Sequence, residues 1–249
     1  MTEGVNPWLE KNHFLLRRLH SLSGIAPVGA FLMVHLFTNS LAAWSPESFD
    51  QHVKDIHHIP YLPIVEWLGI FLPLAFHAGY GVVIARTGKS NVQFYTYADN
   101  WRYTMQRVSG WIALVFMVVH LLHFRFAHWL GGVEYQPAIA AGETPFNVTA
   151  AGFETLLPQA IWFVFYAVGL LASIFHLCNG VTTFCITWGI TVSDASRKRV
   201  SIGATGLAAV LTIWGFSSLI ALTAAPAKDL KAEKSKAAEV VADASRNAG

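Results

Sequence analysis

Long apolar stretches separated by shorter polar segments run through most of this chain. Each stretch exceeds the roughly 20 residues that an α-helix needs to cross ~30 Å of hydrocarbon. We therefore predict an all-α membrane protein with five transmembrane helices. The predicted spans are residues 19–43, 62–84, 108–130, 156–187 and 202–224.

The composition agrees with a membrane protein. Hydrophobic residues make up 54% of the chain and charged residues 13%, against roughly 25% charged residues in soluble domains. The first apolar run follows a polar stretch and is too long for the apolar region of a signal peptide, so we expect it to stay in the membrane. We predict one membrane domain over residues 1–225, followed by a polar tail rich in Ala, Lys and Glu over residues 226–249.

Basic residues collect in alternate polar segments, which predicts the orientation of the helices. Residues of this kind precede span one and lie between spans two and three and between spans four and five, whereas the other two connections carry only Lys54 and Arg125. By the positive-inside rule, the N-terminus lies in the cytoplasm and the C-terminus outside. The basic residues are Lys11, Arg17, Arg18, Arg86, Lys89, Arg102, Arg107, Arg197, Lys198 and Arg199.

Four histidines lie deep inside four different spans: His35, His77, His120 and His176. An ionisable side chain inside a membrane span is a candidate functional group, because lipid offers it no solvation. At 1.5 Å of rise per residue, His35 and His120 belong to the outer half of the membrane, about 20–25 Å from the basic inner ends of their helices. His77 and His176 lie about 14–18 Å from the inner surface.

Local motifs predict the same two pairs. His77 and His176 each begin an H-x-x-x-G pattern, which ends in Gly81 and Gly180. Residues four apart share a helix face, so we expect these glycines to clear space for a flat macrocycle beside the imidazole. Spans one and three instead open with Ser23-Gly24 and Ser109-Gly110, and their histidines follow about three turns later. The pattern indicates a diverged internal repeat.

Two histidine pairs at matched depths favour two haems, each with two axial histidines. Such ligation fills both axial positions of the iron and suits electron transfer more than oxygen chemistry. One alternative is a set of histidines that only form hydrogen bonds between helices. Another is a haem-free scaffold or transporter with a polar path, although a metal pathway would favour carboxylates or thiolates, and the span interiors contain almost no acids.

Around these histidines the chain resembles the five-helix dihaem cytochrome b subunit of bacterial succinate dehydrogenases and related fumarate reductases. The likeness covers roughly residues 14–200. It is carried by Arg17-Arg18-Leu19-His20-Ser21, Pro27-Val28-Gly29, His35-Leu36, Phe71-Leu72-Pro73-Leu74 before His77, Asn100-Trp101, Gln106-Arg107-Val108, Phe175-His176, Asn179-Gly180 and Thr187-Trp188-Gly189-Ile190-Thr191.

The resemblance implies a multi-pass anchor in the bacterial inner membrane. Helices one to four would enclose two b-type haems, with His77 and His176 on the haem proximal to an iron–sulfur subunit and His35 and His120 on the distal haem. Electrons from succinate would pass from a flavoprotein subunit through the iron–sulfur subunit and the haems to a quinone, with menaquinone expected. A third alternative is a dihaem anchor of another dehydrogenase, such as a hydrogenase or formate dehydrogenase.

The sequence itself supports this division of labour. It contains no G-x-G-x-x-G loop and no cysteine spacing suited to an iron–sulfur cluster. The two cysteines, Cys178 and Cys185, are seven residues apart, or ~10 Å along a helix, too far apart for a disulfide within that helix. We therefore predict that the chain is a subunit without dehydrogenase activity of its own.

Further candidate residues follow from depth and charge. Arg18 and Arg107 are placed to contact the propionates of the inner haem, although they could serve topology alone. Asn39, Glu66 and His123 lie at a depth suited to a quinone near the distal haem, and Glu66 could exchange quinone protons. His20 and Ser21 are candidates for a propionate or for the docked iron–sulfur subunit, and His52, His57 and His58 are expected at the outer surface.

Overall fold

The computed structural model describes residues 7–225, and every regular element in this part of the chain is a helix. Five helical stretches within it are long and apolar enough to cross a membrane, which confirms the predicted number of spans. They are Lys11–Ala43, Leu62–Thr87, Ala98–Arg125, Gln159–Thr187 and Asp194–Ala224. The predicted polar tail, residues 226–249, lies outside the described residues.

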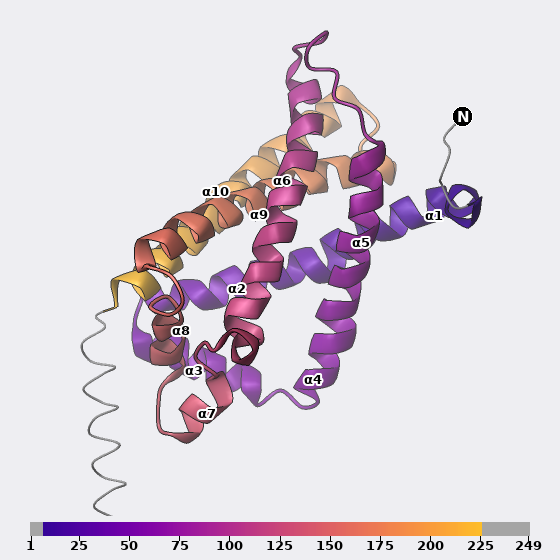
Figure 1. Cartoon of the computed structure of the whole chain (residues 1–249). Helices are drawn as coiled ribbons and strands as arrows, with labels where there is room; N and C mark the ends of the chain where they lie inside the picture. Colours follow the sequence, from indigo (N-terminus) through magenta and orange to yellow (C-terminus); the bar gives the residue numbers. More distant parts are fainter. Residues whose placement is uncertain (1–6, 226–249) are drawn as a thin grey trace, which may run out of the picture. The chain divides into compact units, whose positions relative to one another are not determined.

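The helices follow one another in the order labelled in Figure 1. Several spans are continuous helices made of segments with different hydrogen-bond registers. The elements are α1 (Pro7–Ser23), the π-helix η1 (Gly24–Gly29), α2 (Ala30–Ser40), the 3₁₀ helix η2 (Leu41–Ala43), α3 (Pro46–His57), α4 (Leu62–Ile64), the π-helix η3 (Val65–Phe71), α5 (Leu72–Thr87), α6 (Ala98–His120), the π-helix η4 (Leu121–Arg125), the 3₁₀ helix η5 (Ala127–Leu130), α7 (Tyr135–Ala140), α8 (Pro145–Gly152), α9 (Gln159–Thr187) and α10 (Asp194–Ala224).

Two predicted spans extend beyond the continuous helices of the structure, whereas the other three lie within them. The third continuous helix ends at Arg125 rather than Leu130, because Phe126 leaves the helical region and a separate 3₁₀ turn follows. The fourth helix begins at Gln159 rather than at residue 156, because Leu156 has a positive φ of 67° and Pro158 supplies no N–H for an earlier turn. The apolar pattern continues through both segments, so hydropathy alone placed these ends too far out.

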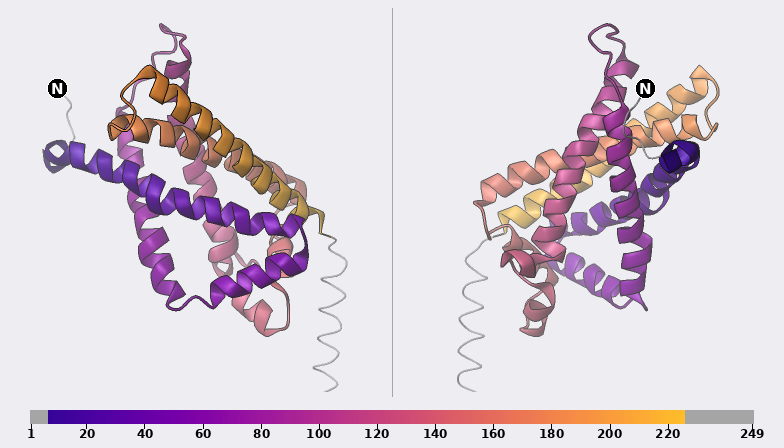
Figure 2. Two further views of the ribbon diagram at one scale, coloured as in Figure 1. Left: turned by 180° about the vertical axis from the view of Figure 1, so that it is seen from behind. Right: turned by 45° about the vertical axis from the view of Figure 1, so that its right-hand side comes forward.

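Contacts group the described residues into two compact units. The first unit contains residues 7–37, 59–115 and 169–213, and in it α1 crosses and packs against α5 (Figures 1 and 2). The second contains residues 38–58, 116–168 and 214–225, and in it the short helices α3 and α7 both pack against α8. The buried core of the second unit is Ala42, Phe49, Phe153, Trp162, Tyr166, Leu219 and Leu222.

Proline explains two of the π-helical segments. Pro27 lies inside η1, where its ring would clash with the carbonyl four residues earlier and its missing N–H breaks the normal ladder. A π-turn takes in one extra residue and relieves this conflict. Pro73, in the first turn of α5, directly follows η3 in the same way.

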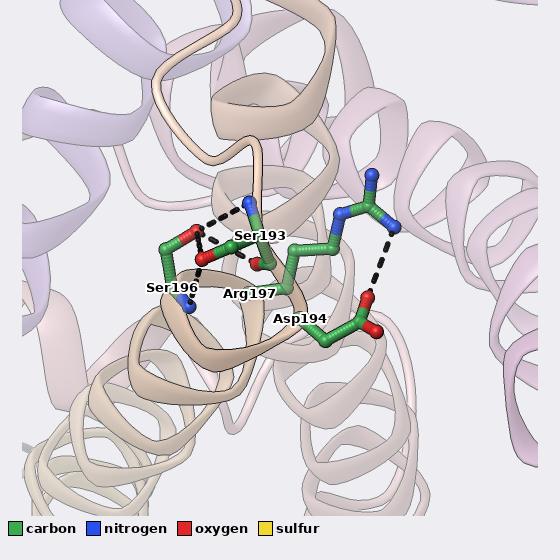
Figure 3. Close-up of polar contacts among 4 residues, drawn as sticks. All are labelled: Ser193, Asp194, Ser196 and Arg197. Atoms are coloured by element: carbon green, nitrogen blue, oxygen red, sulfur yellow. Dashed lines mark hydrogen bonds and ion pairs between the residues drawn. The ribbon is translucent and has the colours of Figure 1, made fainter.

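Reciprocal serine contacts fix the start of the last long helix. The Ser193 hydroxyl accepts from the Ser196 backbone N–H at 3.2 Å, and the Ser196 hydroxyl accepts from the Ser193 N–H at 3.1 Å (Figure 3). Asp194 also pairs with Arg197 at 3.7 Å. A cap of this kind satisfies N–H groups that lack partners within the helix, so α10 begins at a defined residue.

Candidate functional site

The first unit brings His77 of α5 and His176 of α9 together. Their imidazole ring centroids are 6.1 Å apart, and the ring planes are nearly perpendicular at 85°. These are the two histidines that depth and local motif placed in one pair. Within residues 7–225, no three His, Cys, Asp or Glu side chains gather as a larger metal-binding group.

Each of these two rings is oriented by a backbone carbonyl. The Nδ1 atom of His77 lies 2.9 Å from the carbonyl oxygen of His20, and Nδ1 of His176 lies 3.0 Å from that of Gln106. A carbonyl oxygen can only accept, so Nδ1 carries the proton in both rings. The ring nitrogen suited to binding a metal is then Nε2 in both histidines.

The same two pairs of residues are also joined in the opposite direction. Nδ1 of His20 lies 3.0 Å from the carbonyl oxygen of His77, and Nε2 of Gln106 donates to the carbonyl oxygen of His176 at 3.1 Å. The hydroxyls of Ser23 and Ser109 donate to the carbonyls of His20 and Gln106 at 3.0 and 3.2 Å. The same pattern of hydrogen bonds thus occurs twice, as the predicted internal repeat implies, with Gln106 in place of His20.

Glycines on the facing helices make room for the two histidine rings. A Cβ atom on Gly24 would lie 2.6 Å from Nδ1 of His77, and one on Gly110 would lie 3.0 Å from Cε1 of His176. The glycines that follow the histidines by four residues instead face their hydrogen-bond partners. A Cβ on Gly81 would lie 3.2 Å from His20, and one on Gly180 would lie 3.7 Å from Gln106. The Ser-Gly pairs, rather than the H-x-x-x-G motifs, thus provide the space beside the ligand candidates.

Two arginines of the first unit have a buried donor without a protein partner. Nε of Arg18 and Nε of Arg107 are both buried and form no hydrogen bond with the described residues. The Arg18 guanidinium lies against the rings of Phe14 and Trp188, and that of Arg107 lies 3.6 Å from the ring centroid of Tyr103. Aromatic faces therefore hold both cations in place while leaving Nε with unused capacity to donate.

Arg102 is a functional candidate that the sequence analysis treated only as a topological charge. Its guanidinium donates to Asn179 at 3.0 Å, to Ser201 at 3.2 Å and to Thr182 at 3.4 Å. Asn179 in turn donates to Gln106 at 2.8 Å. This network ties α6, α9 and α10 together and supports the side chain that contacts His176. The polar Asn179 inside an apolar helix was the signal that could have revealed it.

The second unit contains His120, at the end of α6, in a different environment. Nδ1 of His120 lies 3.3 Å from the hydroxyl oxygen of Tyr166. The same hydroxyl lies 2.8 Å from Nδ1 of His123, and Nε2 of His123 lies 2.9 Å from the carbonyl oxygen of Gly152. His123 is only 2% exposed, and its ring stacks on Trp162 at 3.9 Å. Tyr166 was not predicted, although its hydroxyl inside an apolar span requires a partner.

The remaining predicted site residues lie in α2 and η3. His35, in α2 of the first unit, contacts the ring of Phe31 at 5.4 Å. His120, by contrast, belongs to the second unit. Asn39 follows His35 by one helical turn in the second unit, and Glu66 lies in the first turn of η3, both partly buried.

Comparison with known proteins decides the family. The profile of the succinate dehydrogenase/fumarate reductase transmembrane subunit family matches residues 85–214. The succinate dehydrogenase cytochrome b558 subunit of Bacillus subtilis (strain 168) is 40% identical over 185 residues, which are 74% of this chain and 85% of that protein. The chain belongs to this family of transmembrane subunits. No solved structure matches it.

Family membership confirms the resemblance found in the sequence. The chain is a multi-pass membrane anchor subunit of the succinate dehydrogenase/fumarate reductase family, not the dehydrogenase subunit itself. Family membership separates it from a membrane transporter and from an anchor of a hydrogenase or formate dehydrogenase. Of the four central histidines, His120 and His176 lie within the matched residues 85–214, and His35 and His77 precede them.

Proposed function

We propose that this subunit holds two b-type haems and conducts electrons between an iron–sulfur partner and a quinone. In the proposal, His77 and His176 are the axial ligands of the inner haem, and His35 and His120 are those of the outer haem. The relative from Bacillus subtilis is named as a cytochrome b558 subunit, which supports haem binding in this chain.

The geometry of His77 and His176 is the observation that carries this proposal. Bonds of about 2.0–2.1 Å from a metal to each imidazole nitrogen, extended by the radius of each ring, put two axial rings about 6 Å apart centre to centre. The 6.1 Å between these two centroids fits one iron between them. Both rings also carry the Nδ1 proton that leaves Nε2 as the ligating atom, the tautomer expected of metal-bound histidines.

The chain's own residues supply orientation and charge. The carbonyls of His20 and Gln106 hold the two inner rings and keep Nε2 of each available to a metal. The buried Nε atoms of Arg18 and Arg107 are donors to which haem propionates can bind. Haem iron with two axial histidines supplies reversible one-electron chemistry.

For the quinone we propose the outer side of the membrane, close to His35 and His120. Asn39, Glu66 and His123 are the candidates named from the sequence, with menaquinone as the expected species. Thr38 adds support, because its buried hydroxyl has no hydrogen-bond partner among the described residues. Thr38 and Asn39 follow His35 by three and four residues, so all three share one face of α2. A polar ligand at this face would satisfy the hydroxyl.

The partners in this proposal are a flavoprotein subunit and an iron–sulfur subunit on the cytoplasmic face. The basic residues support this orientation, because the positive-inside rule favours the cytoplasmic face for the N-terminus and for the connection between spans two and three. This connection exposes three aromatic side chains: Phe94 is 81% exposed, Tyr95 56% and Tyr97 73%. Exposed aromatic residues of this density are typical of a protein interface. Together with the segments around Arg17, Asn100 and Trp188, they form the proposed docking surface.

Haem stoichiometry tests the proposal. The complex purified in mild detergent should contain two non-covalent haems per copy of this chain, because no C-x-x-C-H motif is present to attach them. Acidified organic solvent should therefore extract all of the haem, and mass spectrometry should find the flavoprotein and iron–sulfur subunits. A fully loaded preparation with one haem or none would contradict the dihaem proposal.

A further inference from the structure

Two side chains, those of Tyr166 and His123, link His120 to the backbone of α8 within the second unit. We propose that Tyr166 and His123 are positioning residues for His120, which fix the tautomer, orientation and basicity of this axial ligand. The inference rests on the proposed function, in which His120 binds the outer haem. It assigns to His123 a role different from the quinone contact considered above.

The direction of these hydrogen bonds follows from the Gly152 carbonyl, at which the series of contacts ends. The carbonyl oxygen of Gly152 can only accept, so Nε2 of His123 carries a proton and donates to it over 2.9 Å. In the neutral ring, Nδ1 of His123 is then an acceptor, and it receives the hydroxyl proton of Tyr166 over 2.8 Å. The Tyr166 oxygen keeps its lone pairs for Nδ1 of His120, which donates over 3.3 Å.

This direction sets the state of His120. With its proton on Nδ1, His120 presents Nε2 as the nitrogen that would bind iron, as His77 and His176 do in the first unit. A reversed arrangement, with the Tyr166 hydroxyl donating to His120, would put the proton of a neutral His120 on Nε2 and would prevent ligation. The acceptor nitrogen of His123 excludes that arrangement by holding the Tyr166 proton.

Aromatic packing keeps the three side chains in this geometry. Tyr166 is 7% exposed, and its ring meets Phe116 at 5.3 Å and Phe153 at 5.0 Å, both edge to face. The ring of His123 is covered by Trp162, to which it is nearly parallel at 14°. Because neither ring can rotate without displacing its neighbours, the hydrogen bonds are preorganised before any ligand binds.

The expected consequence is a lower redox potential for the outer haem. A ligating imidazole that donates its second N–H to an acceptor becomes more basic, and a more basic ligand stabilises ferric iron more than ferrous iron. Removing the acceptor should therefore raise the midpoint potential of that haem and loosen the orientation of the His120 ring.

The test compares variants of the whole detergent-purified complex by redox titration and by low-temperature EPR of the oxidised haems. Tyr166→Phe should shift one of the two haem components to higher potential and change its highest g value, while the other component stays as in the wild type. His123→Leu should move the same component in the same direction by a smaller amount. His123→Asn keeps an acceptor oxygen near the position of Nδ1 and should restore wild-type behaviour.

Phe165→Leu is the control for packing, because Phe165 contacts the Tyr166 ring at 5.9 Å but forms no side-chain hydrogen bond. It should lower thermal stability without shifting either potential. An equal shift in Phe165→Leu, or no shift in a Tyr166→Phe complex that retains both haems, would overturn the inference. If Tyr166→Phe does not assemble, the His123→Leu and His123→Asn pair decides, and identical potentials in these two variants would reject it.

These results also separate this inference from the proposed function. If the wild-type complex contains no component with a bis-histidine EPR signature, the proposed function fails. If the wild type has two such components and Tyr166→Phe changes neither, only the role of Tyr166 and His123 is rejected.

Discussion

In the first unit, His77 and His176 place Nδ1 on backbone carbonyls, whereas in the second unit His120 places Nδ1 on the side chain of Tyr166. A backbone acceptor is set by the course of a helix and is present whatever side chain the residue carries. A tyrosine acceptor depends on one hydroxyl and on the partner that holds its proton. The orientation of the two proposed ligands in the first unit is thus insensitive to substitution of the residues that supply the acceptors, while the surroundings of His120 depend on two side chains.

A second comparison lies inside the first unit. His20 and Gln106 occupy equivalent positions of the internal repeat, and each contributes a carbonyl to a histidine and a side-chain nitrogen to the carbonyl of that histidine. The two halves differ in what surrounds them. The His20 ring stacks on His77 at 4.1 Å, whereas Gln106 is held by Asn179. Two chemically different side chains therefore serve the same hydrogen bond.

The largest effect on these comparisons should come from filling the space beside the rings of the first unit. In Gly24→Ala, the new Cβ would lie 2.6 Å from Nδ1 of His77, so the ring must leave its carbonyl partner. We expect loss of the inner haem, so the purified complex should contain about half of the wild-type haem content. Gly110→Ala, with 3.0 Å to His176, should cause a smaller loss of the same component.

Gly79→Ala is the control, because Gly79 lies in α5 beside His77 in the sequence and a Cβ there meets nothing within 4 Å. It should retain both haems and stabilise the helix by about 0.5–1 kcal/mol, the usual difference between Gly and Ala. Full haem content in Gly24→Ala would show that His77 does not need its present position.

The smallest effect is expected from replacing His20 with glutamine, the residue at the equivalent position in the other half of the repeat. His20→Gln supplies the amide nitrogen that Gln106 already provides in the second half, so the carbonyl of His77 should keep its donor. Haem content and the potential of the inner haem should stay close to those of the wild type. His20→Leu removes this second donor while the helical hydrogen bond of the carbonyl remains, and it should lower the free energy of unfolding by about 0.5–1.5 kcal/mol, the net contribution of one hydrogen bond. Equal behaviour of the two variants would argue against the equivalence of His20 and Gln106.

Hydropathy and the depth of the histidines were sufficient to predict the spans and the proximity of His77 and His176. Both follow from physical quantities that are local in sequence, namely the length of an apolar helix and its rise per residue. The internal repeat was also visible, but its spacing is uneven: His35 follows Gly24 by eleven residues and His120 follows Gly110 by ten. The π-helix around Pro27 accounts for the extra residue, and hydropathy does not report it.

Contacts between distant segments could not be predicted from the sequence alone. Tyr166 and His123 meet only because η4 and α9 lie side by side at that level. The carbonyl of Gly152 comes from a short helix that hydropathy assigned to a connection. Arg102 was counted as a charge on one face of the membrane because its partners lie in two other helices. The protein neighbour of Gly81, the His20 ring, also depends on the facing helix, and the space predicted there for a macrocycle stays a prediction.

The pairing of the histidines is the central claim, and redox titration of four ligand variants tests it most directly. His77→Leu and His176→Leu should remove or alter one haem component and slow haem reduction by succinate, because that pair would receive electrons from the iron–sulfur partner. His35→Leu and His120→Leu should alter the other component, leave the first reducible and block quinone reduction. If His77→Leu and His120→Leu instead disturbed one common haem while His176→Leu disturbed the other, the pairing and the proposed electron path would both be wrong.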